Sequence, residues 1–110
     1  MAFTQYHNIL GATARDNELV AIGDALRKTI KAIQITNVDA SAEGTVSLYL
    51  YRNSTDAETD ETIYILHDVV IPYTVSLLLD NPGILGFDNS KYSLHIEVGA
   101  NDEIDVILST

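Results

Sequence analysis

Residues 32–52 read AIQITNVDASAEGTVSLYLYR, and this stretch decides the fold class. Two apolar segments flank a small polar loop that is rich in Asn, Asp, Ser and Gly. In the second segment Val46, Leu48 and Leu50 alternate with residues of the opposite face, which include Tyr49 and Tyr51. Alternation with a period of two is typical of a half-buried β-strand, and the loop composition favours a turn. The stretch therefore predicts two strands joined by a turn.

The same alternation recurs over residues 73–79, 92–98 and 104–109. Segments rich in Asn, Asp, Gly and Pro separate these runs and are typical of turns. With two shorter runs near the N-terminus, the chain holds about seven or eight strands, roughly one every ten residues. No amphipathic helix of useful length lies between them. The pattern predicts an all-β fold, a single antiparallel β-sandwich or jelly roll.

Two of the strand-like runs are irregular. In residues 30–35, a β-bulge near Lys31–Ala32 would keep all the large side chains on one face. Residues 61–71 change parity along their length, so this strand is either buried on both faces or bulged near Leu66–His67. Bulges are therefore expected in the sheets.

One segment has a competing helical interpretation. Residues 15–26 place Leu19, Ile22 and Leu26 at near-helical spacing. Gly23 and the β-branched residues in this segment disfavour a helix. A short strand is the alternative that we favour.

The size and charge of the chain limit its organisation and its partners. Its 110 residues suit one domain, and we expect an N-terminal arm at residues 1–13 and a β-sandwich domain at residues 14–110. The formal net charge is −10, from 16 acidic and 6 basic residues. Such a surface repels phosphate groups, so nucleic acid and membrane surfaces are disfavoured as partners.

The composition also bears on the compartment. The N-terminal sequence has no basic segment followed by a long apolar one, and no apolar run reaches the length of a membrane-spanning helix. The absence of cysteine excludes disulfides, thiolate nucleophiles and Cys-based zinc sites. We expect a soluble protein that is made in a cytoplasm.

No motif for catalysis, cofactor binding or metal binding stands out. His7, His67 and His95 share no ligand spacing, so each is expected to be an isolated strand-face histidine. The acidic loop at residues 54–62 lacks the spacing of a calcium-binding loop, so a solvated loop tip is favoured over a cation site. We therefore expect no enzyme activity, no cofactor and no metal.

Two groups of large side chains have two interpretations each. Ile84, Leu85 and Phe87 follow a Pro-Gly turn, and they either plug one end of the sandwich or form an exposed apolar tip. Burial is favoured because it is the usual state of large apolar residues. Tyr49 and Tyr51 are either interface residues or ordinary solvent-face strand residues, because tyrosine suits both environments.

The order of elements over residues 26–108 is distinctive. A strand KTIKAIQITN leads through a small polar loop to the strand TVSLYLY, and the later segment HDVVIPYTVSLLL precedes a Pro/Gly loop. This order resembles small β-sandwich structural proteins of tailed-bacteriophage virions. The chain departs from longer decoration proteins because it has no immunoglobulin-type cysteine pair and no core tryptophan.

The resemblance implies a non-enzymatic virion protein, most simply a capsid cement or decoration subunit that bridges subunits of the major capsid protein or contacts other virion proteins. It also implies a homotrimer that is assembled in the host cytoplasm and located in the virion. The alternative is a tail-fibre or neck accessory module that binds a carbohydrate or receptor. A cupin-like enzyme is disfavoured by the scattered histidines. The expected protein-interface residues are Phe3, Tyr6 and Ile9 in the arm and Tyr49 and Tyr51 on a strand.

Overall fold

The structure is a computed structural model that describes residues 4–22, 30–52 and 60–109. Within these ranges the chain forms eight strands and one short helix: β1 (Thr4–Leu10), β2 (Asp16–Val20), β3 (Ala32–Asn37), β4 (Gly44–Arg52), β5 (Glu61–Ile71), β6 (Ser76–Leu79), α1 (Pro82–Leu85), β7 (Ser93–Val98) and β8 (Glu103–Ser109). The predicted all-β fold is confirmed.

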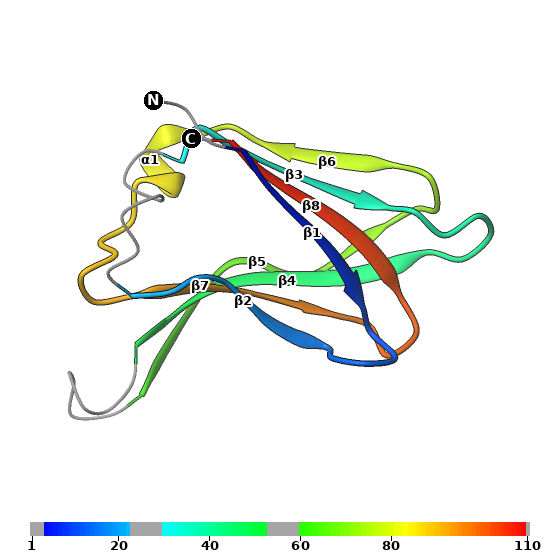
Figure 1. The fold of residues 1–110 in the computed structure, drawn as a ribbon, viewed down its shortest axis with the longest axis horizontal. Coiled ribbons are helices and arrows are strands. Elements are labelled where there is room, and N and C mark those ends of the chain that lie inside the picture. The colour runs from blue at the N-terminus through cyan, green and yellow to red at the C-terminus, as the bar shows by residue number, and fades with distance from the viewer. Residues whose placement is uncertain (1–3, 23–29, 53–59, 110) are drawn as a thin grey trace.

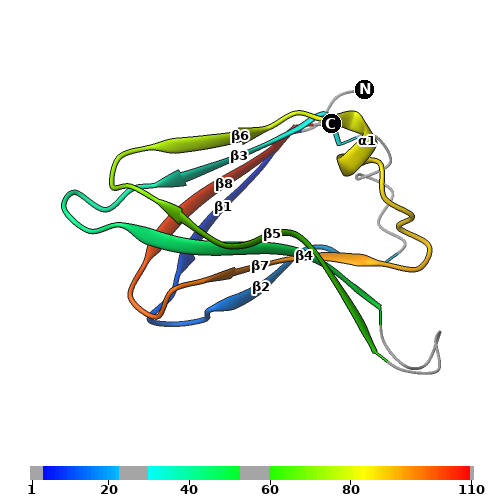
Figure 2. The same cartoon turned by 180° about the vertical axis from the view of Figure 1, so that it is seen from behind.

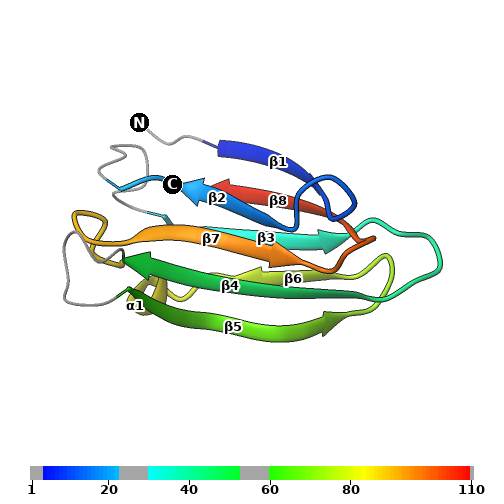
Figure 3. The same ribbon diagram turned by 90° about the horizontal axis from the view of Figure 1, so that it is seen from below.

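The strands form two four-stranded antiparallel sheets that pack face to face as a sandwich (Figures 1 and 2). Sheet A has the order β1-β8-β3-β6, and sheet B has the order β2-β7-β4-β5. Seen from below, β1 and β2 lie along one side of the sandwich, and β5 and β6 lie along the other (Figure 3). Each sheet therefore has one edge strand on each side.

The core lies between the two sheets and consists of the apolar side chains that alternate along the strands. Its fully enclosed members are Ile33, Ile35, Val46, Leu48, Leu94, Ile96, Ile104 and Val106, each with 0% exposure. Burying one such side chain contributes about 1.5–3 kcal/mol to folding. The period-two pattern read from the sequence is thus the pattern that fills the core.

The segment expected to form an arm belongs to the sandwich from residue 4 onward. β1 pairs with β8 along its whole length, from Thr4 opposite Ser109 to Leu10 opposite Glu103. Ile9 is 4% exposed and belongs to the core. These residues therefore form an edge strand and do not extend away from residues 14–110. A strand, β2, also occupies Asp16–Val20, where a helix was the competing interpretation.

Both expected bulges are confirmed. The pairing of β4 with β5 shifts register twice, and one extra residue of β5 lies between Leu66 and Val69. Asp68 in this bulge has a positive φ of 51°. The expected bulge near Lys31–Ala32 is also present, because the Lys31 N–H donates to the carbonyl oxygen of Ser109 at 2.7 Å, although Ser109 is the residue paired with Ala32. Ile30 therefore faces the core together with Ile33.

Polar side chains hold the end of the sandwich at which β3 turns into β4. Asn37 is 1% exposed. Its Nδ2 donates to the carbonyl oxygens of Ala42 and Ile71, at 3.0 Å each. Asp102 Oδ2 accepts hydrogen bonds from the backbone N–H groups of Thr45 and Gly99, at 2.9 Å each. These contacts satisfy backbone groups where the ladders end.

The opposite end is closed by apolar side chains around α1. Leu85 is 2% exposed, and Phe87 packs against the same core, so the predicted plug is confirmed for these two residues. Ile84 departs from the prediction, because it is 47% exposed. The Asn81 side chain accepts a hydrogen bond from the Gly83 N–H at 2.9 Å, as an N-cap does.

Candidate functional site

The outer face of sheet B carries a row of polar and aromatic side chains that crosses all four strands. Glu18 on β2 is opposite His95 on β7, His95 is opposite Tyr49 on β4, and Tyr49 is opposite Tyr64 on β5. They share one face because their neighbours along each strand alternate into the core. We call Asp16, Glu18, Tyr49, Tyr51, Tyr64, Ser93 and His95 the sheet B cluster.

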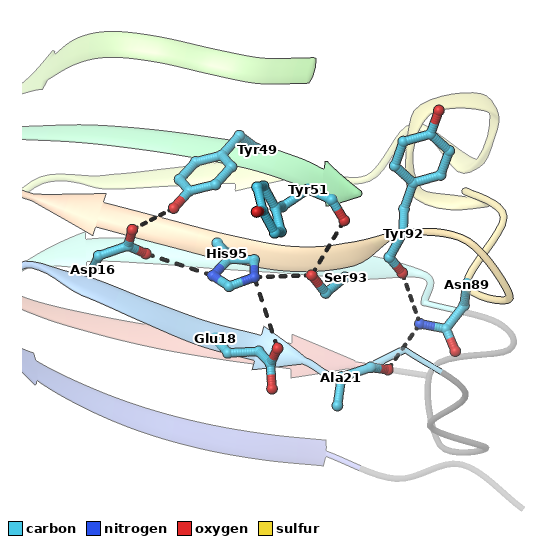
Figure 4. Close-up of polar contacts among 9 residues, drawn as sticks. All are labelled: Asp16, Glu18, Ala21, Tyr49, Tyr51, Asn89, Tyr92, Ser93 and His95. Carbon is cyan, nitrogen blue, oxygen red and sulfur yellow. Dashed lines mark hydrogen bonds and ion pairs between the residues drawn. The ribbon is translucent and has the colours of Figure 1, made fainter. Parts of the chain in front are cut away.

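The rings of this cluster pack against one another, and Figure 4 shows those of Tyr49, Tyr51 and His95. Tyr49 stacks on His95 with ring centroids 5.2 Å apart and planes 11° from parallel. Tyr51 meets the same imidazole edge-on at 5.9 Å, and Tyr64 lies tilted against Tyr49 at 5.7 Å. Cross-strand aromatic pairs of this kind each stabilise a sheet by roughly 0.2–1 kcal/mol. The rings thus form a small packed layer on the outer face.

Carboxylates surround the imidazole in the centre of the cluster. Asp16 Oδ1 lies 3.5 Å from His95 Nδ1, and Glu18 Oε2 lies 3.7 Å from His95 Nε2. The Tyr49 hydroxyl donates to Asp16 Oδ2 at 2.5 Å. Ser93 Oγ lies 2.9 Å from His95 Nε2 (Figure 4). Each imidazole nitrogen therefore faces a carboxylate, and β2 supplies both of these carboxylates.

Both candidate tyrosines remain protonated donors at neutral pH. Burial raises the pKa of Tyr49, and its hydrogen bond to Asp16 and the negative charges nearby raise it further. The hydrogen bond that the Tyr51 hydroxyl donates to Asp60, at 3.0 Å, raises the pKa of Tyr51. Neither hydroxyl is therefore poised to act as a base or nucleophile.

Ser93, His95 and Asp16 have the connectivity of a serine-hydrolase triad, but their surroundings do not suit nucleophilic catalysis. Ser93 is only 3% exposed, and its hydroxyl also lies 3.3 Å from the carbonyl oxygen of Tyr51. A substrate carbonyl has no access to an oxygen enclosed in this way. Glu18 also competes for the nitrogen that would take the serine proton. The geometry favours a structural role for the cluster.

The described histidines lie apart from one another. His7 is on β1 of sheet A, whereas His67 and His95 are on β5 and β7 of sheet B. The expectation that His95 is isolated is wrong, because β2 brings two carboxylates to it. Across residues 4–22, 30–52 and 60–109, no group of three or more potential ligands is arranged to hold a metal ion. Most of the acidic loop at residues 54–62 lies outside the described ranges.

A loop contact ties the end of β2 to the segment before β7. Asn89 is 5% exposed, and its Nδ2 donates to the carbonyl oxygens of Ala21 and Tyr92, at 3.0 and 3.2 Å (Figure 4). The amide group bridges two backbone carbonyls that no strand pairing satisfies. Asn89 therefore has a structural role beside the cluster.

The predicted interface residues do not form one surface. Tyr6 is 74% exposed on the outer face of sheet A, whereas Ile9 belongs to the core. Tyr49 and Tyr51 lie on the opposite side of the sandwich, and each donates its hydroxyl within the chain. Phe3 lies outside the described residues. Of this set, Tyr6 has by far the most exposed side chain that the structure describes.

The outer face of sheet A differs in character from that of sheet B. Tyr6, Ile107, Gln34 and Leu78 form a row across its four strands. Leu78 is 57% exposed. Three of the four strands, β1, β3 and β6, contain no Asp, Glu, Lys or Arg, and only β8 contributes acidic residues. We call this surface the sheet A face.

No known protein family matches the sequence, and no curated protein matches it. Within the described ranges, no helix has the length and apolar character that crossing a membrane would require.

Proposed function

We propose that this protein is a non-enzymatic structural subunit that works by association, as a capsid cement or decoration protein of a tailed-phage virion does. The sheet A face carries the proposal. It exposes Tyr6 and Leu78 on a sheet with few charges, in a chain whose net charge is −10. The resemblance of residues 26–108 to phage virion proteins supports the same role.

A face with few charges is the part of an acidic protein that another protein covers at least cost in free energy. Burying an unpaired carboxylate in an interface costs several kcal/mol, whereas burying apolar and neutral polar groups does not. Protein interfaces are accordingly depleted in Asp, Glu and Lys at their centres and enriched in Tyr. On the sheet A face the acidic residues are confined to β8, and the Asn8 side chain donates to both of their carboxylates, Glu103 at 3.2 Å and Asp105 at 2.7 Å.

The proposed partners are the major capsid protein or other virion proteins, together with further copies of this chain. The proposed location is the virion, after assembly in the host cytoplasm. The resemblance implies a homotrimer, but the proposal itself requires only that copies associate, and the mass in solution gives their number.

The test is co-sedimentation of the purified protein with capsids that lack it, together with two single substitutions. Leu78→Asp places a charge on the sheet A face and should abolish binding to the particle. Ile84→Asp changes a side chain of similar exposure, 47%, on α1 at the end of the sandwich, and should leave binding intact. Failure to bind particles, or equal effects of the two substitutions, would contradict the proposal.

The second candidate function is carbohydrate or receptor binding by a tail-fibre or neck module. The aromatic row of the sheet B cluster favours it, because sugars stack on aromatic rings. Against it, the Tyr49 and His95 rings stack on each other and are not both free for a sugar. Tyr64, at 50% exposure, is the more accessible ring. Glycan-array binding that is lost in Tyr49→Ala, Tyr51→Ala or Tyr64→Ala would favour this function over the first.

A further inference from the structure

Three of the four sheet edges carry features that discourage another strand from pairing with them. β2 has a register shift after Glu18 and carries two carboxylates. β5 has two register shifts and carries Glu61 and Asp68. β6 is only four residues long and is followed by Asp80. Bulges, charges and short length are the usual means by which proteins protect sheet edges.

The fourth edge, β1, has none of these features. It is seven residues long, TQYHNIL, with no charged residue and no proline. Its pairing with β8 is regular from Thr4 to Leu10. β1 also extends beyond β2 when the sandwich is seen from below, so sheet B does not cover its outer side (Figure 3).

The hydrogen-bonding pattern indicates which backbone groups of β1 point outward. The Gly11 N–H donates to the Asp102 carbonyl at 2.8 Å, where the ladder between β1 and β8 ends. Because bonding direction alternates in an antiparallel ladder, Ile9, His7 and Gln5 face β8. The backbone N–H and C=O groups of Tyr6 and Asn8 therefore point away from β8, toward the free edge.

We propose that β1 pairs with β1 of a second copy of this chain, antiparallel and about a two-fold axis at His7. The backbone N–H of Tyr6 donates to the carbonyl oxygen of the partner's Asn8, and the Tyr6 carbonyl accepts from the N–H of the partner's Asn8. The two-fold axis repeats both bonds between Asn8 and the partner's Tyr6. This register overlaps the whole of β1 and joins the two A sheets into one sheet of eight strands. It goes beyond the proposed function, which requires association without a fixed number of copies, because a two-fold contact gives an even number of copies.

Charge indicates which edge a second copy could approach. Two chains of net charge −10 repel each other, and pairing β2 with β2 or β5 with β5 would bring like carboxylates together. Pairing β1 with β1 brings together only neutral side chains at neutral pH. Among the described edges longer than four residues, it is the one that allows copies to approach without such repulsion.

Side chains around the proposed axis support the same register. A hollow of ≈ 380 Å³ lies over β1 and β8, lined by Tyr6, His7, Asn8, Asp105, Val106 and Ile107. The partner's Tyr6 would lie opposite Asn8, beside this hollow. His7 Nε2 is buried without a hydrogen-bond partner among the described residues. The partner's His7 would lie directly opposite and supply a neighbour for it.

The first test is the mass of the full chain in solution, by light scattering over a range of concentrations. We expect twice the mass of one chain. Asn8→Pro removes an outward N–H and leaves the bonds of β1 to β8 in place, because proline is tolerated on the outer side of an edge strand. It should give the mass of one folded chain, with folding checked by circular dichroism. Asn8→Ala, which keeps the N–H, should retain the dimer.

The register is tested by cross-linking, which the absence of native cysteine makes simple. His7→Cys places two thiols opposite each other on the axis and should form a disulfide-linked dimer under mild oxidation. Gln5→Cys lies on the same face, but opposite the partner's Ile9, and should not. Cross-linking of Gln5→Cys without His7→Cys would overturn the register.

Three mass results would overturn the pairing itself: a monomer at all concentrations, a trimer, or a dimer whose mass is unchanged by Asn8→Pro. A monomer whose binding to another protein is lost in Asn8→Pro would also overturn it, since the edge would then accept a strand of different origin. A dimer that passes these tests but does not bind particles would contradict the proposed function and leave the pairing standing.

Discussion

The buried hydroxyl of Ser47 accepts a hydrogen bond from the backbone N–H of Asp68 at 2.9 Å, and it lies 3.2 Å from Asp68 Oδ1. Ser47 is 3% exposed, and Asp68 adopts a left-handed φ of 51° in the bulge of β5. Aspartate tolerates this conformation better than most residues because its short side chain bonds locally. A serine on one strand therefore fixes the bulge on its neighbour.

Ser47→Ala should destabilise the protein by about 1–2 kcal/mol, because it leaves the Asp68 N–H without its partner. Urea unfolding at pH 7 measures the change. Ser76→Ala is the matched control: it also removes a strand hydroxyl, which is 2.7 Å from Thr36 Oγ1, but at an exposed position. Equal losses in the two variants would show that the bulge does not depend on Ser47.

Gly11→Ala should destabilise the protein by about 1–3 kcal/mol, because overpacking a tight contact forces the backbone to shift. A Cβ on Gly11 would lie 1.8 Å from the carbonyl oxygen of Gly99. Gly83→Ala is the control, since its Cβ would meet only a side-chain atom, Asn81 Oδ1, at 3.2 Å. In thermal unfolding, the melting temperature of Gly11→Ala should be well below that of the wild type, and that of Gly83→Ala should be close to it.

The stability of the protein should fall as the pH decreases through 6.5, with a contribution from His7. Burial lowers the pKa of His7 from 6.5. The unfolded chain therefore binds a proton at a higher pH than the folded chain does, and the free energy of unfolding declines between 6.5 and the lower folded value. Above pH 6.5 this contribution is complete.

Urea unfolding between pH 8 and pH 5 measures this dependence, at concentrations where one chain is the main species. His7→Gln should flatten the pH profile. Gln5→Ala is the control, because it alters the neighbouring inward position of β1 and keeps the histidine. A His7→Gln profile as steep as that of wild type would show that His7 does not contribute.

Tyr49 should ionise at higher pH in the folded protein than in the unfolded chain, because burial and Asp16 raise its pKa from 10.0. Its contribution to stability is present below pH 10.0 and is lost as the pH rises toward the folded value. Tyr49→Phe should remove that part of the alkaline loss, and at pH 7 it should cost about 0.5–1.5 kcal/mol for the lost hydrogen bond. Ultraviolet titration of the tyrosines, with urea unfolding at pH 7 and above 10, tests both effects.

The strands were predictable because a strand with one buried face needs apolar side chains at every second position, as with Leu94 and Ile96 on β7. The bulge at Asp68 was also predictable, since the change of parity along residues 61–71 requires an extra residue if the large side chains are to face inward. These features depend on the local sequence, so they can be predicted from it.

The sheet B cluster was not predictable in the same way. Asp16 and Glu18 reach His95 because β2 pairs with β7, and pairing between strands distant in the chain leaves no mark in either segment. The helix α1 did have a local signal, because Asn81 followed by Pro82 suits the start of a helix. Because we interpreted this segment only as a turn, we did not predict the helix.

The pairing of Thr4 with Ser109 at one end of the β1–β8 ladder has a mechanical consequence. A force pulling these two residues apart would load the hydrogen bonds one pair at a time, and β1 would peel from its neighbour. A force between Thr4 and Glu103, at opposite ends of the ladder, would strain all the pairs together. The force that this strand pair withstands therefore depends on the direction of pulling more than on the number of hydrogen bonds.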